Sequence, residues 1–326
     1  MASVRPERRL RVRRIRTCTV LRYAESVDEF LAWCKQKRRS CKTEKLADRS
    51  MSIFFDELFE DGAAMTVASY TLFGYLLLKL VPSVPERQCL PLSRASLGAW
   101  RSNRAGSSRV GMVPQVIYHF ADFCAVLGEI QASLAVLVQY DLFARPSEIL
   151  GMKFGDIVKA VQAFGTPYGV LFGNADFGSV TKTGATDDVV LADSPHRPWC
   201  NDLLKFLFRC MTEPQASFFS LSLHQYEELF RRFSKQFGIR SGLFTPHVIR
   251  HSGPSFDIIH QHRTFETIQT RGRWTATQSV NRYRKPGRLL MEASRLPRFF
   301  DKYTEEPLHR ALSSILRSRW ADARTL

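Results

Sequence analysis

The chain has 326 residues, enough for two domains, and its 47 lysines and arginines outnumber its 31 acidic residues. A net charge of +16 and a pI near 9.8 favour a polyanionic partner, for which nucleic acid is the first candidate. Residues 1–106 carry 20 basic and 11 acidic residues, and residues 107–326 carry 27 and 20, so both halves could face the same polymer.

The cysteine, histidine and apolar patterns exclude several protein classes. The seven cysteines form no C-x-x-C pair, and no cysteine or acidic residue stands at metal-ligand spacing from His260 and His262. No apolar run is long enough to span a bilayer, and the N-terminus lacks the apolar segment of a secretory signal. We therefore expect an intracellular protein with reduced thiols, no metal and no cofactor, in the nucleus of a eukaryote or the cytoplasm or nucleoid of a bacterium.

The N-terminal stretch is strongly basic, with seven arginines and one acidic residue in residues 1–16. Such a run repels itself and predicts a disordered basic arm over residues 1–22. Its role stays open between a DNA-contacting arm, a nuclear-import signal, an organelle-targeting segment and a solvated tail.

Residues 23–106 predict a small all-helical domain. Apolar residues recur there at helical spacing in three or four segments, which Asp-Gly and several prolines separate. A bundle of about four helices is the architecture that buries such faces, and we expect Trp33 and Trp100 in its core.

Residues 101–110, RSNRAGSSRV, predict a linker between two domains because they lack a large apolar residue before Val110. Arg101, Arg104 and Arg109 lie in this stretch and could follow a phosphate backbone.

Residues 107–326 predict a second domain of mixed type. A long apolar stretch at 113–143 indicates two buried helices. Residues 167–191 change to β-branched and aromatic residues broken by Gly, Asn and Asp, which predicts a small antiparallel sheet with tight turns. Helical spacing returns at 202–211, 221–237 and 307–319. The predicted fold class is thus mainly α with a small antiparallel sheet, beside an all-α bundle.

The segment Thr245–His251, TPHVIRH, carries the first candidate site residues. Thr245 and Pro246 are typical of an N-cap and a first helical residue. A helix starting there would place His247 and Arg250 on one face, near an end that favours anions. An arginine presents fixed donors to a phosphate, and a histidine can exchange a proton near neutral pH.

Further candidates lie upstream. Arg145 precedes Pro146, which can occupy the first position of a helix, so Arg145 would stand at a helix mouth. Glu148, three residues on, could orient an arginine by hydrogen bonding. Lys182 lies in TKTG at the expected tip of the hairpin. A lysine there could protonate the 5′ oxygen that leaves when a phosphodiester is cut.

The last candidates lie after the histidine motif, in RGRWTATQSVNRYR. The Trp274 indole N–H could donate to a phosphate oxygen, and the phenol oxygen of Tyr283 could act as a covalent nucleophile. Basic neighbours, including Arg284, favour the phenolate of Tyr283. We also expect Arg273 and Arg284 to contact DNA.

Together these motifs follow the order Arg…Lys…His-x-x-Arg…Trp…Tyr, which resembles the tyrosine recombinases, the integrase-like strand-exchange enzymes. The resemblance covers residues 108–288 well. LFEDGAAMTVASYTLFGYLL and SLGAWRSNRAG resemble, more loosely, the core-binding domain of the same family, which predicts that residues 23–106 bind DNA and residues 107–326 form the catalytic domain. A C-terminal helix in this family often docks on a neighbouring protomer, although packing on its own domain is an equal alternative.

The resemblance implies the role of each matched residue. It implies that Tyr283 attacks a backbone phosphate to give a 3′-phosphotyrosyl link, with His247 assisting proton transfer and His251 and Glu148 supporting the catalytic side chains. Trp274 stands where many members have histidine, and an indole cannot carry a proton at neutral pH. The implied catalytic set is Arg145, Lys182, His247, Arg250, Trp274 and Tyr283.

The predicted function is therefore DNA cleavage and rejoining in site-specific recombination or integration by a mobile-element protein. Its partners would be double-stranded DNA and three further copies in a homotetramer on two duplexes. The alternatives are a domesticated or decayed recombinase that only binds DNA and a type IB topoisomerase-like enzyme. The absence of an acidic cluster near the basic motifs disfavours a metal-dependent nuclease.

Overall fold

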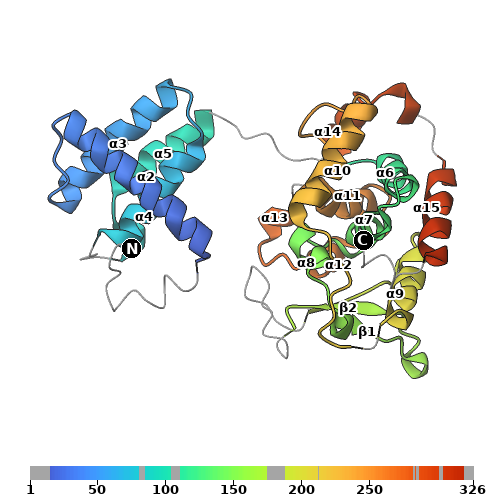
Figure 1. Cartoon of the computed structure of the whole chain (residues 1–326). Helices are drawn as coiled ribbons and strands as arrows, with labels where there is room; N and C mark the ends of the chain where they lie inside the picture. The colour runs from blue at the N-terminus through green and yellow to red at the C-terminus, as the bar shows by residue number, and fades with distance from the viewer. Residues whose placement is uncertain are drawn as a thin grey trace. The chain divides into compact units, whose positions relative to one another are not determined.

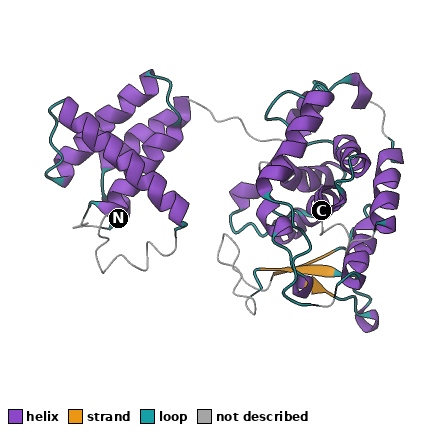
Figure 2. Cartoon of the chain, in the orientation of Figure 1, coloured by secondary structure: helices purple, strands orange, loops and turns teal. Residues whose placement is uncertain are grey.

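The computed structural model describes residues 15–80, 85–103, 111–174, 188–211, 213–281, 283, 286–300 and 304–318. Over these residues the chain is mainly helical with one small antiparallel sheet, which confirms the predicted fold class (Figures 1 and 2). The chain divides into two compact units, Met1–Ser107 and Ser108–Leu326. None of the described helices is long and apolar enough to cross a membrane.

The first unit is a helical bundle around an aromatic core. Phe30 and Phe54 pack at its centre, and Trp33 and Trp100 are buried beside them as predicted. The Trp33 indole donates a hydrogen bond to Glu57 at 2.8 Å. The elements are α2 (Thr17–Gln36), α3 (Glu44–Glu60), α4 (Met65–Leu78), the short 3₁₀ helix η2 (Glu86–Gln88) and α5 (Pro91–Asn103).

Helix α2 begins at Thr17, inside the stretch predicted as a disordered arm over residues 1–22. The physical reason is the absence of a helix breaker: no Gly or Pro lies between Thr17 and residue 23, so the helix extends back to the end of the arginine-rich segment. The rest of the predicted arm, residues 1–14, lies outside the described residues.

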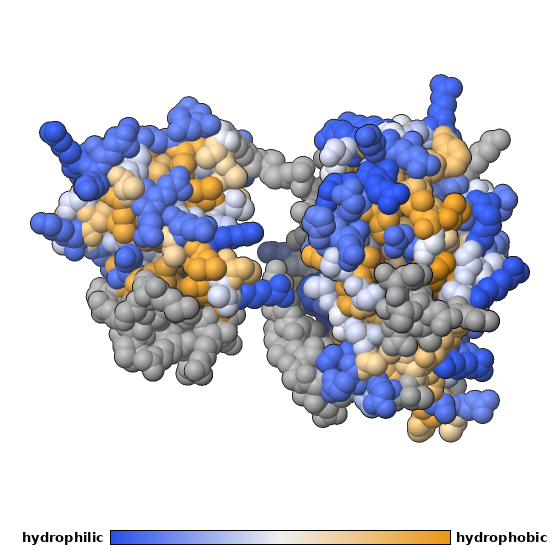
Figure 3. Space-filling view, in the orientation of Figure 1, coloured by the Kyte–Doolittle hydropathy of each residue, from blue (hydrophilic) through white to orange (hydrophobic). Residues whose placement is uncertain are grey.

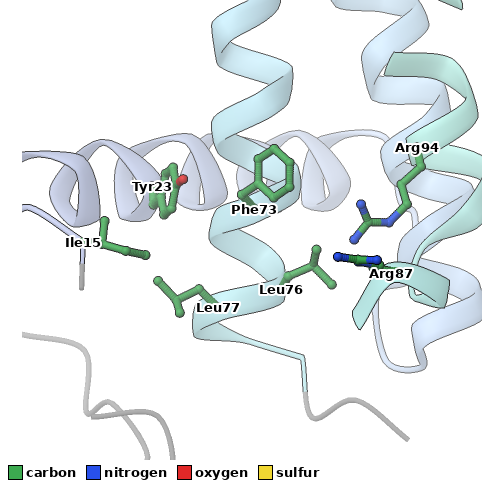
Figure 4. A pocket seen from close by; sticks show the side chains of 7 residues that line it. All are labelled: Ile15, Tyr23, Phe73, Leu76, Leu77, Arg87 and Arg94. Atoms are coloured by element: carbon green, nitrogen blue, oxygen red, sulfur yellow. The ribbon is translucent and has the colours of Figure 1, made fainter. Parts of the chain in front are cut away.

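A mainly apolar hollow lies in the first unit. It measures about 350 Å³ and is lined by Tyr23 and Phe73, with two arginines, Arg87 and Arg94, at one side (Figure 4). None of the predicted site residues lines it, so it does not belong to the candidate site.

The second unit is built around one buried helix. In α7 (Ile130–Leu142) every residue from Gln131 onward is buried, as the long apolar stretch at 113–143 predicts. The buried residues of α7 include the polar or charged Gln131, Ser133, Gln139 and Asp141. The other elements are α6 (Pro114–Val126), α8 (Pro146–Leu150), η3 (Phe154–Asp156), η4 (Gln162–Phe164), α9 (Trp199–Arg209), α10 (Leu223–Gln236), α11 (Pro246–Ile259), α12 (Phe265–Arg271), α13 (Thr277–Asn281), α14 (Pro286–Ala293), η6 (Arg298–Phe300) and α15 (Glu306–Arg317).

Helix α11 approaches α7 closely because Gly253 has no side chain. A Cβ at Gly253 would lie 2.5 Å from the Phe143 ring and closer still to the Tyr140 carbonyl oxygen. Buried Gln139 also links α7 to α11 by hydrogen bonds, since its side-chain amide donates to the carbonyls of Ala144 at 3.2 Å and Pro246 at 2.9 Å. The start of α11 is thereby fixed against the end of α7.

The sheet has the order β1-β2-β3, with strands β1 (Ile157–Val158), β2 (Gly169–Phe172) and β3 (Asp188–Leu191). Both pairs are antiparallel, with Ile157 opposite Val170 and Leu171 opposite Val189. The predicted hairpin is therefore present, although its connection, residues 175–187, lies outside the described residues.

The C-terminal helix α15 packs on its own unit, the second of the two alternatives. Its face of Leu308, Ala311 and Ile315 is buried in the main core, and Arg310 pairs with Asp122 of α6 at 2.6 Å. On the face shown in Figure 3, hydrophilic side chains cover much of each unit with apolar patches between them.

Candidate active site

Arg145 stands at the corner between α7 and α8. Phe143 ends α7 in the left-handed conformation at φ 53°, and Arg145 is the N-cap of α8 with Pro146 at its first position, as predicted. Glu148 accepts hydrogen bonds from the Arg145 backbone N–H at 2.7 Å and from Nη1 of the same residue at 2.5 Å. Glu148 therefore fixes the orientation of the Arg145 side chain.

Arg250 lies on the first turns of α11 and is only 4 % exposed. Its Nη1 donates to the Phe143 carbonyl and its Nη2 to the Gly272 carbonyl, both at 2.6 Å. Its guanidinium carbon lies 4.9 Å from the centre of the Trp274 ring, a cation–π distance. Two backbone carbonyls and one indole thus fix the position of this cation.

Thr245 takes the N-cap position of α11 but forms no side-chain capping hydrogen bond. His247, at the helix start, is exposed to solvent, whereas Arg250, three residues later, is buried. The motif predicted the helix start and the placing of Arg250 near it.

Arg273 is buried at 6 % exposure rather than open to solvent, and it is one of the few non-glycine residues with a positive φ, 54°. Its Nη2 donates to Glu148 at 2.6 Å, and its guanidinium lies 4.0 Å from the centre of the Phe172 ring. Its Nε is buried without a hydrogen-bond partner. The side chain of Arg273 therefore lies inside the arginine cluster, and its contact with DNA stays a prediction.

Glu148 is the shared carboxylate of three arginines, since Arg250 Nη1 also lies 3.6 Å from it. Together these four side chains carry a surplus of two positive charges. Burial alone would raise the pKa of Glu148, but the charges of Arg273 and Arg250 and the hydrogen bond from Arg145 lower it overall. Burial and the repulsion of Arg145 and Arg273 lower the pKa of Arg250 to about 9. A cluster with this charge favours an added anion.

Tyr283 lies beside this cluster and contacts a histidine. Its phenol oxygen is 2.7 Å from Nδ1 of His251, and its ring lies 5.1 Å from the Trp274 ring. Tyr283 is 4 % exposed and packs with Phe143, Ile268 and Val280 in a small apolar cluster. Its phenol group also acts on the pKa of Arg250, which places the oxygen within the electrostatic range of the arginines.

The histidine that contacts Tyr283 is His251, whereas the sequence motif assigned the place beside the tyrosine to His247. The two residues are four apart on α11, so they lie on the same side of the helix, and His251 is one turn deeper in the protein. Residue spacing alone does not distinguish them, because the contact with Tyr283 joins residues 32 positions apart.

Several predicted residues cannot be placed in the site. Lys182, Arg104, Arg109 and Arg284 lie outside the described residues. Arg101 is exposed at the end of α5 in the first unit. In the described part of the chain, no three His, Cys, Asp or Glu side chains are grouped to hold a metal ion.

Sequence reasoning missed the place of Arg273 in the arginine cluster. One signal was available: Gly272 separates Arg273 from Arg271, and a Cβ at this glycine would overlap the Trp274 ring. The close turn that a glycine permits here brings Arg273 and Trp274 back onto the site.

No protein-family model matches the chain, and no curated protein does. Among solved structures it is similar to XerH site-specific recombinase bound to palindromic difH substrate, with 12% identity, 80% of this chain and 73% of that chain covered, and a TM-score of 0.47. It is similar to the Tn1549 transposon integrase in complex with transposon right end DNA, with 13% identity, coverages of 85% and 99%, and a TM-score of 0.47. It is also similar to XerA recombinase, with 17% identity, coverages of 89% and 95%, and a TM-score of 0.39.

These likenesses are distant, and the roles of the side chains are inferred from the contacts described above.

Proposed function

We propose that the chain cleaves and rejoins DNA strands through a covalent bond between Tyr283 and a 3′ phosphate. The observation that supports this most strongly is the contact of the Tyr283 phenol with His251 beside three arginines that share one carboxylate. A nucleophile, a proton acceptor and a cationic phosphate site are thus assembled by residues far apart in the sequence.

In the proposed reaction the arginines hold the scissile phosphate. Attack on a phosphodiester gives a pentavalent phosphorane with more negative charge than the ground state, and preorganised cations stabilise it selectively. Arg250 is already held by two carbonyls, so little reorganisation is required when the phosphate arrives. Arg145 adds a second guanidinium, and bidentate contacts would fix the geometry of the phosphate oxygens.

Proton transfer completes the step. With Nδ1 of His251 as the acceptor, the Tyr283 hydroxyl loses its proton to His251 as its oxygen bonds to phosphorus. The bond from phosphorus to the 5′ oxygen breaks, and Lys182 is proposed to protonate that leaving oxygen. His247, exposed at the mouth of α11, is proposed to assist proton transfer from the solvent side, and the Trp274 indole to donate to a phosphate oxygen. Attack by a 5′-hydroxyl reverses the sequence, so the phosphodiester energy is retained.

The burial of Tyr283 adds one requirement. An oxygen on a side chain with 4 % exposure cannot reach phosphorus unless the segment that carries it shifts. We therefore expect DNA binding to expose Tyr283, through movement of the short helix α13 and the residues that follow it.

The partners in this proposal are double-stranded DNA and other copies of the chain. Residues 23–106 would act as a core-binding domain and residues 107–326 as the catalytic domain, with residues 1–16 as a basic arm. Both parts of the chain carry a basic surplus, so both could contact phosphate. A homotetramer on two duplexes, acting in a nucleus or a bacterial nucleoid, completes the proposal.

A second candidate function is DNA binding without cleavage, as in a domesticated recombinase. The burial of Tyr283 favours it, because a nucleophile that never leaves its apolar cluster is inert. The two candidates differ in one observable, the covalent adduct.

The experiment uses nicked suicide duplexes that carry candidate element ends, with the full-length protein and a denaturing gel. The proposed function predicts an adduct that Tyr283→Phe abolishes while DNA affinity stays near that of the unmodified protein, since only one oxygen is lost. Tyr303→Phe is the matched control, because acidic Asp301, Glu305 and Glu306 surround Tyr303 in sequence and repel phosphate. DNA binding without any adduct would favour the second candidate, and an adduct that persists in Tyr283→Phe would show that another residue is the nucleophile.

A further inference from the structure

Six charged side chains of the second unit form a closed ring of ion pairs. Arg197 bonds Asp141 at 2.7 Å and holds both oxygens of Asp257 at 2.7 and 2.8 Å. Asp257 also accepts from Arg263 at 3.2 Å, and Arg263 donates to Asp193 at 2.7 Å. The sixth member, Arg271, closes the ring by bonding Asp193 at 2.9 Å and Asp141 at 2.8 Å.

The ring is neutral and mostly buried. Three guanidinium groups alternate with three carboxylates, so every charge has an opposite charge on both sides. The side chains of Asp141, Arg197 and Asp257 have at most 1 % exposure, whereas Asp193 is 41 % exposed. A buried ion pair seldom adds net stability over apolar packing, so a ring of this size calls for a role besides stability.

The elements that the ring joins are those that surround Arg250. Asp141 is near the end of α7, Asp257 is on α11 two turns after Arg250, and Arg271 is the last residue of α12. Asp193 follows β3, whose neighbour β2 supplies the Phe172 ring beneath Arg273.

The link to Arg250 runs through two backbone carbonyls. The Phe143 carbonyl, which accepts from Arg250 Nη1, comes two residues after Asp141, and the Gly272 carbonyl, which accepts from Nη2, comes directly after Arg271. Arg271 also donates to the Asp141 carbonyl through Nε at 3.1 Å and Nη2 at 3.0 Å. The bonds between Arg271 and Asp141 therefore join the two chain segments that carry the acceptors of Arg250.

We propose that this ring is a positioning device for the phosphate-binding arginine: Asp193, Arg271 and Asp141 hold the carbonyls of Phe143 and Gly272 at the spacing that aims the guanidinium of Arg250. The inference rests on the proposed function of Arg250. None of the ring members touches the phosphate, so they act only through Arg250 and the elements that carry it. Displacement of a catalytic group by about 1 Å can cost about 10²-fold in rate, so a loosened ring slows cleavage before it weakens DNA binding.

The test uses Asp193, because its partial exposure lets a substitution be tolerated. Asp193→Asn keeps the size of the side chain and removes the charge that joins Arg263 to Arg271. Asp193→Glu restores the charge with one more methylene. The matched control is Asp122→Asn, which removes the partner of Arg310 between α6 and α15, away from the ring. Each variant is compared for single-turnover adduct formation, DNA affinity and melting temperature.

A second readout reports on the arginine site without cleavage. Low-millimolar sulfate, at ionic strength matched with chloride, should raise the melting temperature of the unmodified protein by binding the arginine cluster. The sulfate-induced rise in melting temperature that is lost in Arg250→Gln measures sulfate binding at the arginine cluster. Asp193→Asn should lose most of this rise, and Asp122→Asn should keep it.

The expected result is that Asp193→Asn lowers the adduct rate about 10-fold or more, with DNA affinity within about twofold, and that Asp193→Glu recovers much of the rate. Asp122→Asn should lower the melting temperature yet leave the rate within about twofold. The positioning role would be overturned if Asp193→Asn forms the adduct as fast as the unmodified protein and shows the same rise in melting temperature with sulfate. It would also be overturned if Asp193→Asn and Asp122→Asn lose equal parts of the adduct rate and of the sulfate response. If the unmodified protein forms no adduct, the proposed function fails, and the sulfate readout still decides whether the ring positions Arg250.

Discussion

The phenol oxygen of Tyr283 lies 2.7 Å from Nδ1 of His251, a residue one turn deeper along α11 than the His247 that the motif places beside the tyrosine. The contact gives the phenol a proton acceptor in an apolar cluster where no bulk water is required. It also joins Tyr283 to the helix that carries Arg250. The proposed proton acceptor His251 and the proposed phosphate ligand Arg250 are therefore neighbours on α11.

His251→Gln should lower the rate of adduct formation by about 10²-fold or more, because a positioned acid–base group contributes about 10²- to 10⁴-fold. Glutamine can keep a hydrogen bond to Tyr283 but cannot take its proton. The measurement is single-turnover cleavage of a nicked duplex.

His247→Gln is the matched control on the same helix, and since His247 is exposed its replacement should have the smaller effect. A larger loss in His247→Gln than in His251→Gln would return the main proton-transfer role to His247.

Arg145→Lys and Arg250→Lys should each lower cleavage by about 10²-fold or more, as for the loss of one preorganised donor to a transition state. Lysine keeps the charge but loses the planar fork, and in the case of Arg250 it cannot reach both the Phe143 and Gly272 carbonyls in the same geometry. DNA affinity, measured by titration at fixed salt, should change little. Equal losses of affinity and cleavage would show that these arginines only position the DNA.

Much of this fold follows from local patterns. The largely apolar stretch that forms α7 predicts a buried helix, and Pro146 and Pro246 predict the helix starts that bring Arg145 and Arg250 to the site. These features depend on residues within one or two turns of each other, which a single sequence displays.

Other features depend on contacts between distant segments. The choice of His251 over His247 depends on where Tyr283 enters, and the burial of Arg273 depends on Glu148, far upstream. The ring through Asp141 and Arg271 joins residues 130 positions apart. Charged residues at such distances look like solvated surface positions in the sequence, because nothing local indicates their partners.

Glu148→Gln should destabilise the protein at pH 7, because it leaves Arg145, Arg250 and Arg273 without their shared carboxylate. Breaking a buried ion pair costs about 3–5 kcal/mol. The pKa of Glu148 is lower in the folded protein than its usual 4.5, so its stabilisation is present above pH 4.5 and is lost as the pH falls through the folded pKa. The difference in melting temperature between the unmodified protein and Glu148→Gln should therefore become smaller below about pH 4.5.

Glu57→Gln is the control for this pH series. The hydrogen bond from the Trp33 indole is the main cause of the lowered pKa of Glu57, but the Glu57 side chain is 42 % exposed and its ion-pair partner Lys37, at 3.2 Å, is 46 % exposed. Glu57→Gln should lower the melting temperature at pH 7 by less than Glu148→Gln does. If the melting temperature of Glu148→Gln stays below that of the unmodified protein by the same amount down to pH 3, the proposed charge balance of the arginine cluster is wrong.

Gly253→Ala should both destabilise the second unit and slow cleavage, because the added methyl group has no space between α11 and α7. Its Cβ would lie 2.5 Å from the Phe143 ring, and overpacking of this kind costs about 1–3 kcal/mol. Relief requires α11 to move away from α7, which carries Arg250 and His251 away from the Phe143 carbonyl and from Arg145. A displacement of about 1 Å would lower the cleavage rate by about 10²-fold.

The matched substitution is Gly98→Ala in the middle of α5, where an added Cβ meets no atom within 4 Å. Alanine is favoured over glycine inside a helix by about 0.5–1 kcal/mol, so Gly98→Ala should raise the melting temperature and leave cleavage unchanged. Thermal unfolding and single-turnover cleavage of both variants separate the two effects. A Gly253→Ala protein that melts and cleaves like the unmodified chain would show that the contact between α11 and α7 does not set the position of Arg250.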